Sequence, residues 1–180
     1  MGTTTPTRLL TWEEFLNLPE SDWMRQELHH GELFEMPPAR HGHKDIQRRL
    51  IRLLERAATT TWLAAEEIGF RPSTGPEYWI GDVIFTQVAR WNAVPRDGVM
   101  SYVPELVIEV LSPSNRPGKM RERKNVCLEN GGREFWVIDP KKRLVTVSTP
   151  DGNSITYQSG QQIPLFFNSS ATITVDAIFE

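Results

Sequence analysis

The stretch PELVIEVLSPSNR, residues 104–116, holds the pattern that decides the fold of this chain. Its centre LVIEVL is a run of apolar, mostly branched residues that only Glu109 interrupts, which is typical of a core strand. Pro117 then suits the first turn of a helix, and Asn130 with the two glycines after it can end that helix in left-handed geometry. Residues 134–139, EFWVID, again have a near-continuous apolar centre, as expected for a strand in a sheet covered on both faces. These segments predict an α/β fold.

Outward from this centre, two glycine-containing turns predict hairpins. Residues 24–36 form two extended runs around His30-Gly31, and residues 143–158 form two more around Asp151-Gly152. Glycine supplies the positive φ that such tight turns need. A mostly extended tail follows the second hairpin.

Two helices and two strands complete the expected elements. Thr11 and Glu14 have the spacing of a capping box at the start of a short helix. Residues 44–58 carry apolar side chains at helical spacing and basic residues at most other positions, which predicts an amphipathic, basic helix. Residues 62–70 and 78–85 are rich in aromatic and β-branched residues, as in core strands. We expect one domain, residues 1–180: a mixed sheet flanked by helices, with an N-terminal and a C-terminal hairpin.

The composition is ordinary for a globular protein, with 39% hydrophobic and 24% charged residues among 180. The single cysteine, Cys127, cannot form an intramolecular disulfide, and no apolar run approaches the roughly 18 residues of a membrane span. We therefore expect a cytoplasmic protein without membrane contact. The net charge of −3 excludes a generally positive surface, so any nucleic-acid site must be local.

Two acidic residues inside apolar strands are the most informative positions for chemistry. Asp82 interrupts YWIGDVIF as Glu109 interrupts LVIEVL. A buried carboxylate is costly unless it is paired, hydrogen-bonded or bound to a metal. Either residue alone could equally be a structural ion pair or face solvent at a strand end. The two together favour a functional site.

A cationic segment follows the Glu109 strand. RPGKMRERK, residues 116–124, contains five basic residues and one acid, and it could hold phosphate. For Lys124 alone, a solvated helix face is the simpler explanation. Glu27, flanked by apolar residues on its strand, is a further candidate.

These segments together resemble a known family. RQELHHGELFEMPPARHGH, GDVIF, PELVIEVLSPSNR and GGREFWVID, which occur in this order between Leu10 and about Pro164, are similar to the Uma family of restriction endonuclease-like proteins. That family belongs to the PD-(D/E)XK nuclease superfamily. The resemblance implies a restriction-endonuclease-like core and a metal-dependent endonuclease that hydrolyses phosphodiester bonds, with DNA as the expected substrate.

The residues can be assigned roles on this basis. Asp82 and Glu109 would hold Mg²⁺ or Mn²⁺, which prefer hard oxygen ligands. The superfamily lysine stands two residues after the second acid, where this chain has Leu111. The resemblance suggests that a lysine from the next helix replaces it, so Lys124 would orient or deprotonate the attacking water. Glu27 would be an auxiliary acid.

Two basic segments should contact nucleic acid, and a second copy of the chain should complete the protein. The expected contacts are His41, Arg48, Arg52, Arg116 and Arg121. The tail around Phe166 and Phe167, with the second hairpin, should leave apolar edge surface exposed, which predicts a homodimer.

Two other classes of function stay open. The nuclease fold could serve as a binding module for nucleic acid or protein without turnover. Alternatively, His41 and His43 could begin a cupin-like metal site, although the glutamate expected shortly after such a pair is missing. His29 and His30 are expected to be turn residues without a functional role.

Overall fold

A six-stranded sheet forms the centre of the computed structural model, which describes residues 8–19, 24–113 and 116–180. The strand order is β3-β4-β5-β6-β7-β8. Strands β5 and β6 are parallel and all other neighbours are antiparallel, so the sheet is mixed, as expected. The strands are β3 (Trp62–Phe70), β4 (Trp79–Gln87), β5 (Leu106–Val110), β6 (Glu134–Asp139), β7 (Leu144–Ser148) and β8 (Ser154–Tyr157).

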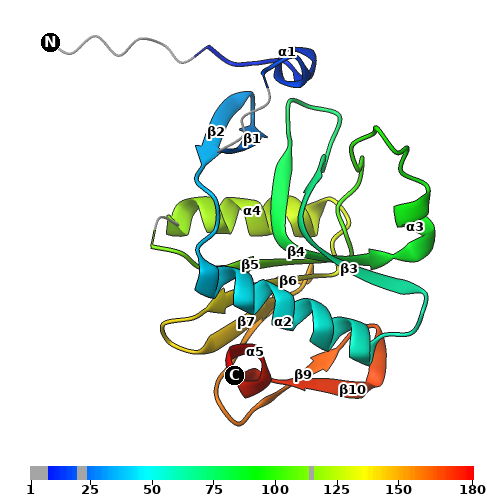
Figure 1. Ribbon diagram of the computed structural model, residues 1–180, viewed down its shortest axis with the longest axis vertical. Helices are drawn as coiled ribbons and strands as arrows, with labels where there is room; N and C mark the ends of the chain where they lie inside the picture. Colours follow the sequence, from blue (N-terminus) through cyan, green and yellow to red (C-terminus); the bar gives the residue numbers. More distant parts are fainter. Residues whose placement is uncertain (1–7, 20–23, 114–115) are drawn as a thin grey trace, which may run out of the picture.

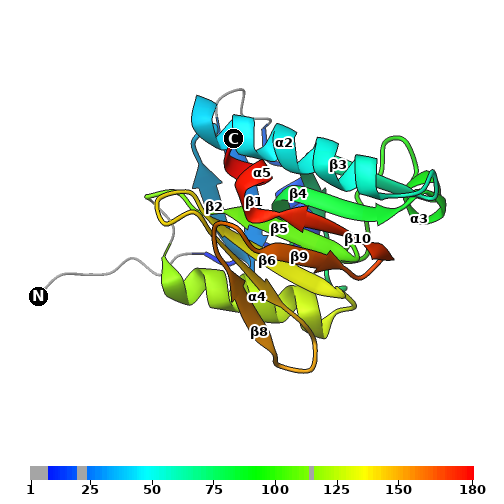
Figure 2. The same cartoon turned by 90° about the horizontal axis from the view of Figure 1, so that it is seen from below.

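Helices cover both faces of this sheet. The basic helix α2 (His41–Ala57) lies on one face and α4 (Pro117–Glu129) on the other, as Figure 2 shows. Side chains alternate accordingly: Ile108 packs into the core on the α2 side, whereas its neighbour Val107 packs with Cys127 of α4. Within the described residues, no helix combines the length and apolar character that crossing a bilayer requires.

The predicted N-terminal elements are confirmed. Helix α1 (Trp12–Leu16) begins with a complete capping box between Thr11 and Glu14. Strands β1 (Arg25–His29) and β2 (Glu32–Met36) form the hairpin, with positive φ at His30 and Gly31. Leu28 and Tyr78 exchange two backbone hydrogen bonds of 2.9 and 2.7 Å, which fix β1 beside the start of β4 (Figure 1).

The C-terminal tail closes the α2 side of the core. The hairpin β7–β8 is confirmed, and the tail is extended in β9 (Gln162–Leu165) and β10 (Asn168–Thr174) before a short helix, α5 (Val175–Phe179), that the sequence did not predict. Phe167 packs against Trp62 and Phe85, and Phe166 against Trp62. The two phenylalanines are therefore partly buried against the core, and they expose less apolar surface than expected. One more short helix, α3 (Val88–Asn92), follows β4 and was not predicted either.

Candidate active site

The two acids meet where β4 and β5 separate. Pairing between these strands ends at Val83 and Ile108, and the same register places Asp82 opposite Glu109 one residue further. Asp82 Oδ2 instead accepts a hydrogen bond of 2.9 Å from the N–H of Val110. The Asp82 carboxylate thus binds a backbone N–H that does not pair with β4. Asp82 and Glu109 lie side by side, with 4% and 5% of their surface exposed.

Glu27 reaches the same place from β1. Its Oε1 accepts the backbone N–H of Ile80 at 2.8 Å, and its Oε2 lies 2.8 Å from Nε2 of His29. Glu27 has no exposed surface. The hairpin therefore delivers a third carboxylate, because β1 is anchored beside the start of β4.

Arg123 of α4 joins these acids. Its Nη1 donates to Glu109 Oε1 at 2.7 Å and to the carbonyl oxygen of Ile80 at 2.8 Å, while Nη2 donates to Glu27 Oε2. The guanidinium also lies 5.1 Å from the ring centre of Trp79. Arg123 and Cys127, one helical turn apart, are the buried residues of α4. The face of α4 that packs on the sheet therefore carries the cation of the site.

Lys124 is not at this site, which corrects the sequence-based assignment. It lines a pocket with residues of the β7–β8 turn, among them Ser148 and Asn153. One residue advances a helix by roughly 100°, so Lys124 leaves the face that Arg123 occupies. The structure brings Glu27, Asp82 and Glu109 together and supplies Arg123 as their partner.

The protonation of the three acids differs. Burial raises the pKa of Glu109 to about 8, and the charges of Asp82 and Glu27 add to the rise that Arg123 opposes. Burial also acts on Glu27, but Arg123 and His29 outweigh it and hold the pKa of Glu27 below its usual range. The pKa of Asp82 is likewise lowered, because contacts with His43 and the Val110 N–H outweigh its burial.

Arg123 stays charged in this environment. Burial works against its charge, but Glu109 and Glu27 outweigh burial and raise the pKa of the guanidinium further above its ordinary high value. Such a group cannot take up a proton from water. It can hold and neutralise negative charge.

The donor set fits a hard divalent cation. Asp82 and Glu109 provide carboxylate oxygens whose mutual repulsion a cation would relieve. Gln47 of α2 donates from Nε2 to the carbonyl oxygen of Asp82 at 3.0 Å, and its buried Oε1 has no hydrogen-bond partner. Among the described residues, no three His, Cys, Asp or Glu side chains are grouped to hold an ion. Two carboxylates, those of Asp82 and Glu109, suit Mg²⁺ or Mn²⁺, which can use one or two carboxylates together with water and substrate phosphate.

Two histidines near the acids were missed as contributors. His29 was expected to be an idle turn residue, but it is buried, contacts Glu27 and stacks on Trp79 with ring centres 3.7 Å apart. His43 Nε2 lies 3.1 Å from Asp82 Oδ1, without the alignment of a hydrogen bond. His43 is four residues before the buried Gln47 on α2, and this spacing is the signal that could have found it.

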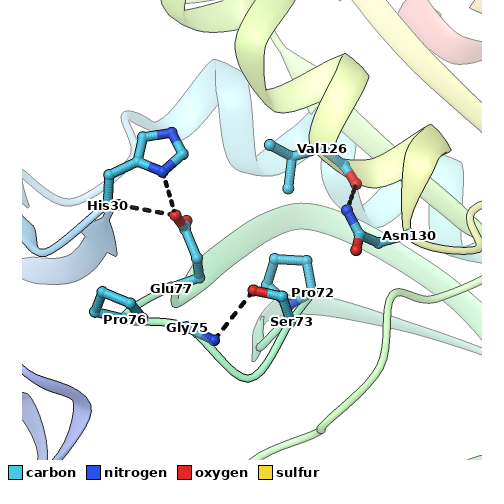
Figure 3. A pocket seen from close by; sticks show the side chains of 8 residues that line it. All are labelled: His30, Pro72, Ser73, Gly75, Pro76, Glu77, Val126 and Asn130. Carbon is cyan, nitrogen blue, oxygen red and sulfur yellow. Dashed lines mark hydrogen bonds and ion pairs between the residues drawn. The ribbon is translucent and has the colours of Figure 1, made fainter.

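The other histidines do not support a cupin-like metal site. His41 is 90% exposed and lies 3.0 Å from Asp45 on its own helix. His30 lies beside an open pocket of about 440 Å³, where its Nδ1 is 2.7 Å from Glu77 (Figure 3). Its Nε2 is 3.0 Å from Glu122. All four histidines fall within the described residues, and no group of metal-ligand size includes them. The four histidines contact different acids, so the cupin-like interpretation, which requires them to converge on one metal, has no support in these contacts.

The expected nucleic-acid contacts lie on accessible surface. Arg48 and Arg52 are exposed on α2, one turn apart, and no ion pair is found for either within the described part of the chain. Arg121 is exposed on α4, as is Arg116 at the N-cap of that helix. Both basic segments thus present unpaired charge.

Comparisons with known proteins agree with this geometry. Residues 12–179 match the sequence profile of the family Uma2, described as "Putative restriction endonuclease". Among solved structures, the fold is similar to that of a protein from Anabaena variabilis, described as a "putative nuclease belonging to DUF820". The TM-score is 0.82 at 22% sequence identity, over 94% of this chain and 97% of that one. The comparison with curated proteins gives no match. The expected fold, a restriction-endonuclease-like core, is confirmed.

Proposed function

This chain belongs to the Uma2 family, and we propose that it is a Mg²⁺- or Mn²⁺-dependent endonuclease that hydrolyses phosphodiester bonds in DNA. The observation that carries the proposal is the meeting of three buried carboxylates and one buried arginine where β4 and β5 separate. A buried cluster of this kind is expensive to maintain for stability alone. Perturbed acids gathered in this way are typical of functional sites.

Phosphodiester hydrolysis requires an activated water and neutralisation of the charge that develops on phosphorus-bound oxygens. A divalent cation held by Asp82 and Glu109 would supply the Lewis acid and the means to generate hydroxide near neutral pH. The contribution of the protein is to hold these two carboxylates at a fixed separation. The Val110 N–H bond to Asp82 and the Arg123 bond to Glu109 do this.

Arg123 would stabilise charge on the phosphate. It cannot act as the base, because the guanidinium stays protonated at physiological pH and cannot accept another proton. The role first given to Lys124 is therefore divided: Arg123 neutralises and orients, and deprotonation of water depends on the metal ion. Glu27 is a positioning residue, since it holds the other end of the Arg123 guanidinium.

The DNA would be held by the basic segments on both sides of the acids. Arg48 and Arg52 on α2 lie on one face of the sheet, and Arg116 and Arg121 on α4 lie on the other. Contact by His41, which is exposed at the start of α2, is also expected. Such charges fix a phosphate backbone and carry no sequence preference of their own.

A binding module without turnover is the second candidate. The absence of a lysine at the acids favours this second candidate. Among the described residues, Glu27 and Glu109 pair with Arg123, and no lysine makes an ion pair with Glu27, Asp82 or Glu109. If the water needs a protein base, this site would bind metal and DNA without cleaving.

The test is cleavage of single-stranded, duplex and RNA substrates with Mg²⁺, Mn²⁺ or EDTA. Asp82→Asn and Glu109→Gln should lose both cleavage and metal binding, the latter measured by calorimetry with Mn²⁺. Metal binding without cleavage of any substrate would favour the binding module. Cleavage that is unaffected by EDTA would contradict the metal-dependent mechanism.

Assembly and location complete the proposal. A homodimer would allow both strands of a duplex to be cut. The edge strand β8, where Ile155 is 56% exposed, would offer apolar surface for it. Light scattering checks the dimer, and cell fractionation checks a cytoplasmic location.

A further inference from the structure

We propose that Arg25, His43 and Lys44 form a binding site for a phosphodiester oxyanion, next to Asp82 and on the side away from Arg123. This inference rests on the proposed nuclease function and deepens it: the site would hold a backbone phosphate neighbouring the one that is cleaved. The three residues come from β1 and from the first turn of α2. Their acidic neighbours are Asp82, Glu67 and, for Lys44, also Glu66.

Their hydrogen-bonding capacity is only partly used. Arg25 Nη1 lies 3.2 Å from Glu67 Oε1 and 3.5 Å from Asp82 Oδ1, but its Nε is buried without a hydrogen-bond partner. His43 Nε2 is also buried without one, although Asp82 is 3.1 Å away. Lys44 Nζ lies 2.7 Å from Glu67 Oε1 and 3.7 Å from Glu66 Oε2, and these two contacts do not use all three of its donors. Buried donors that lack partners cost stability, so they indicate a ligand.

The three side chains are partly exposed, so a ligand can approach them, although Arg25 Nε and His43 Nε2 themselves are buried. The exposed fraction is 22% for Arg25, 14% for His43 and 34% for Lys44. By comparison, the side chain of Arg123 is 11% exposed, and Glu27 and Glu109 hold it. Arg123 is therefore the interior cation, paired with Glu27 and Glu109. Arg25, His43 and Lys44 form an outer group in which some donors have no hydrogen-bond partner.

The backbone supports the same conclusion at two points. Glu67, in the middle of β3 and opposite Asp82 in register, has φ of 55°, a left-handed conformation that costs free energy for a residue other than glycine. That conformation brings Glu67 to Arg25 and Lys44. The first turn of α2 contains no acidic residue and its N-cap has no side-chain hydrogen bond. An open helix start of this kind favours anions.

A purely structural salt-bridge network is the alternative, and it explains less. Such a network would use Arg25 through its guanidinium fork and would not leave Nε and His43 Nε2 without partners. An oxyanion with several acceptor oxygens satisfies the donors that the acids leave unused.

The test is an NMR titration of the metal-free protein with inorganic phosphate and with the dinucleoside phosphate TpT, at constant ionic strength set with chloride. The backbone amides of Gly42, His43 and Lys44 should shift and saturate with TpT. The double variant Arg25→Met, Lys44→Ala should weaken the dissociation constant by about tenfold, the order that charge-assisted hydrogen bonds contribute. Arg96→Met, an exposed arginine after α3, is the matched control and should leave it unchanged.

Shifts that do not saturate, or equal affinity in the double variant, would overturn the site. Saturation with inorganic phosphate but not with TpT would overturn its assignment to a diester. If the double variant does not fold, Lys44→Ala alone must weaken binding. Failure of the nuclease proposal is seen separately. TpT binding without cleavage of any substrate would reject the nuclease and retain this site. Cleavage without TpT binding would retain the nuclease and reject this site.

Discussion

Arg123 and Lys124 differ by one position on α4, and that difference decides which cation meets the acids. Arg123 lies three residues after Met120 and four before Cys127, both of which pack toward the sheet. Lys124 stands equally well placed between Met120 and Leu128, which is also partly buried. The sequence could therefore predict a cation on this helix but not the correct residue. Only the packing of α4 on the sheet distinguishes the two.

The Glu27–Arg123 pair should make stability depend on acidity. The pKa of Glu27 is lower in the folded protein than its ordinary value of 4.5, so the pair stabilises the fold fully above that value. This contribution is lost as pH falls through the lowered pKa. Glu27→Gln should therefore reduce the free energy of unfolding by about 3 to 5 kcal/mol at pH 7, since it breaks a buried ion pair.

Urea unfolding between pH 7 and pH 3 measures this effect. The difference between parent and variant should shrink toward acid pH. Glu35→Gln, an exposed position on β2, is the matched control and should behave as the parent. A difference that is constant across this pH range would mean that the charge of Glu27 does not stabilise the fold.

At the scale of elements, strands with strong local patterns and the capped helix α1 were predicted, whereas the short helices α3 and α5 were not. The apolar runs of β4, β5 and β6 are long enough for their composition to identify them. Helices α3 and α5 have five residues each, too few for an amphipathic pattern, and they depend on contacts with the rest of the chain. The separation of β4 from β5 at Asp82 also has no sequence signal beyond the acids themselves.

The exposed arginines of α2 should attract the DNA backbone by their positive charge. Changing both Arg48 and Arg52 to glutamate should weaken DNA binding at low salt. If both contact phosphates, the slope of log affinity against log salt concentration should fall by about 2. Fluorescence anisotropy with a duplex at several salt concentrations measures both quantities.

The control for α2 is the double variant Arg96→Glu, Lys141→Glu, which makes the same change of charge at two exposed positions outside the basic segments. It should leave the salt slope unchanged. Equal losses in the α2 variant and in this control would mean that overall charge, and not the α2 face, determines binding.

At the scale of the whole molecule, the site exists only because distant segments meet. Glu27 and Arg123 are 96 positions apart in the sequence, and Glu27 is 53 positions from Ile80. The sequence could identify Glu27, Asp82 and Glu109 as unusual residues, and the family resemblance placed them in one fold. The sequence could not predict that His29 contacts Glu27 or that Gln47 donates a hydrogen bond to the carbonyl oxygen of Asp82. Those contacts depend on how β1 and α2 pack on the sheet.

The most direct test of the account is nicking of supercoiled plasmid by the parent, Arg123→Met and Lys124→Met, each with Mg²⁺, Mn²⁺ or EDTA. Circular dichroism first establishes that each variant is folded. The account predicts metal-dependent nicking by the parent, a loss of about 10²-fold or more in Arg123→Met, as for removal of a charge-stabilising donor, and an unchanged rate in Lys124→Met. No nicking by the parent with either metal, or loss in Lys124→Met with full activity in folded Arg123→Met, would contradict it.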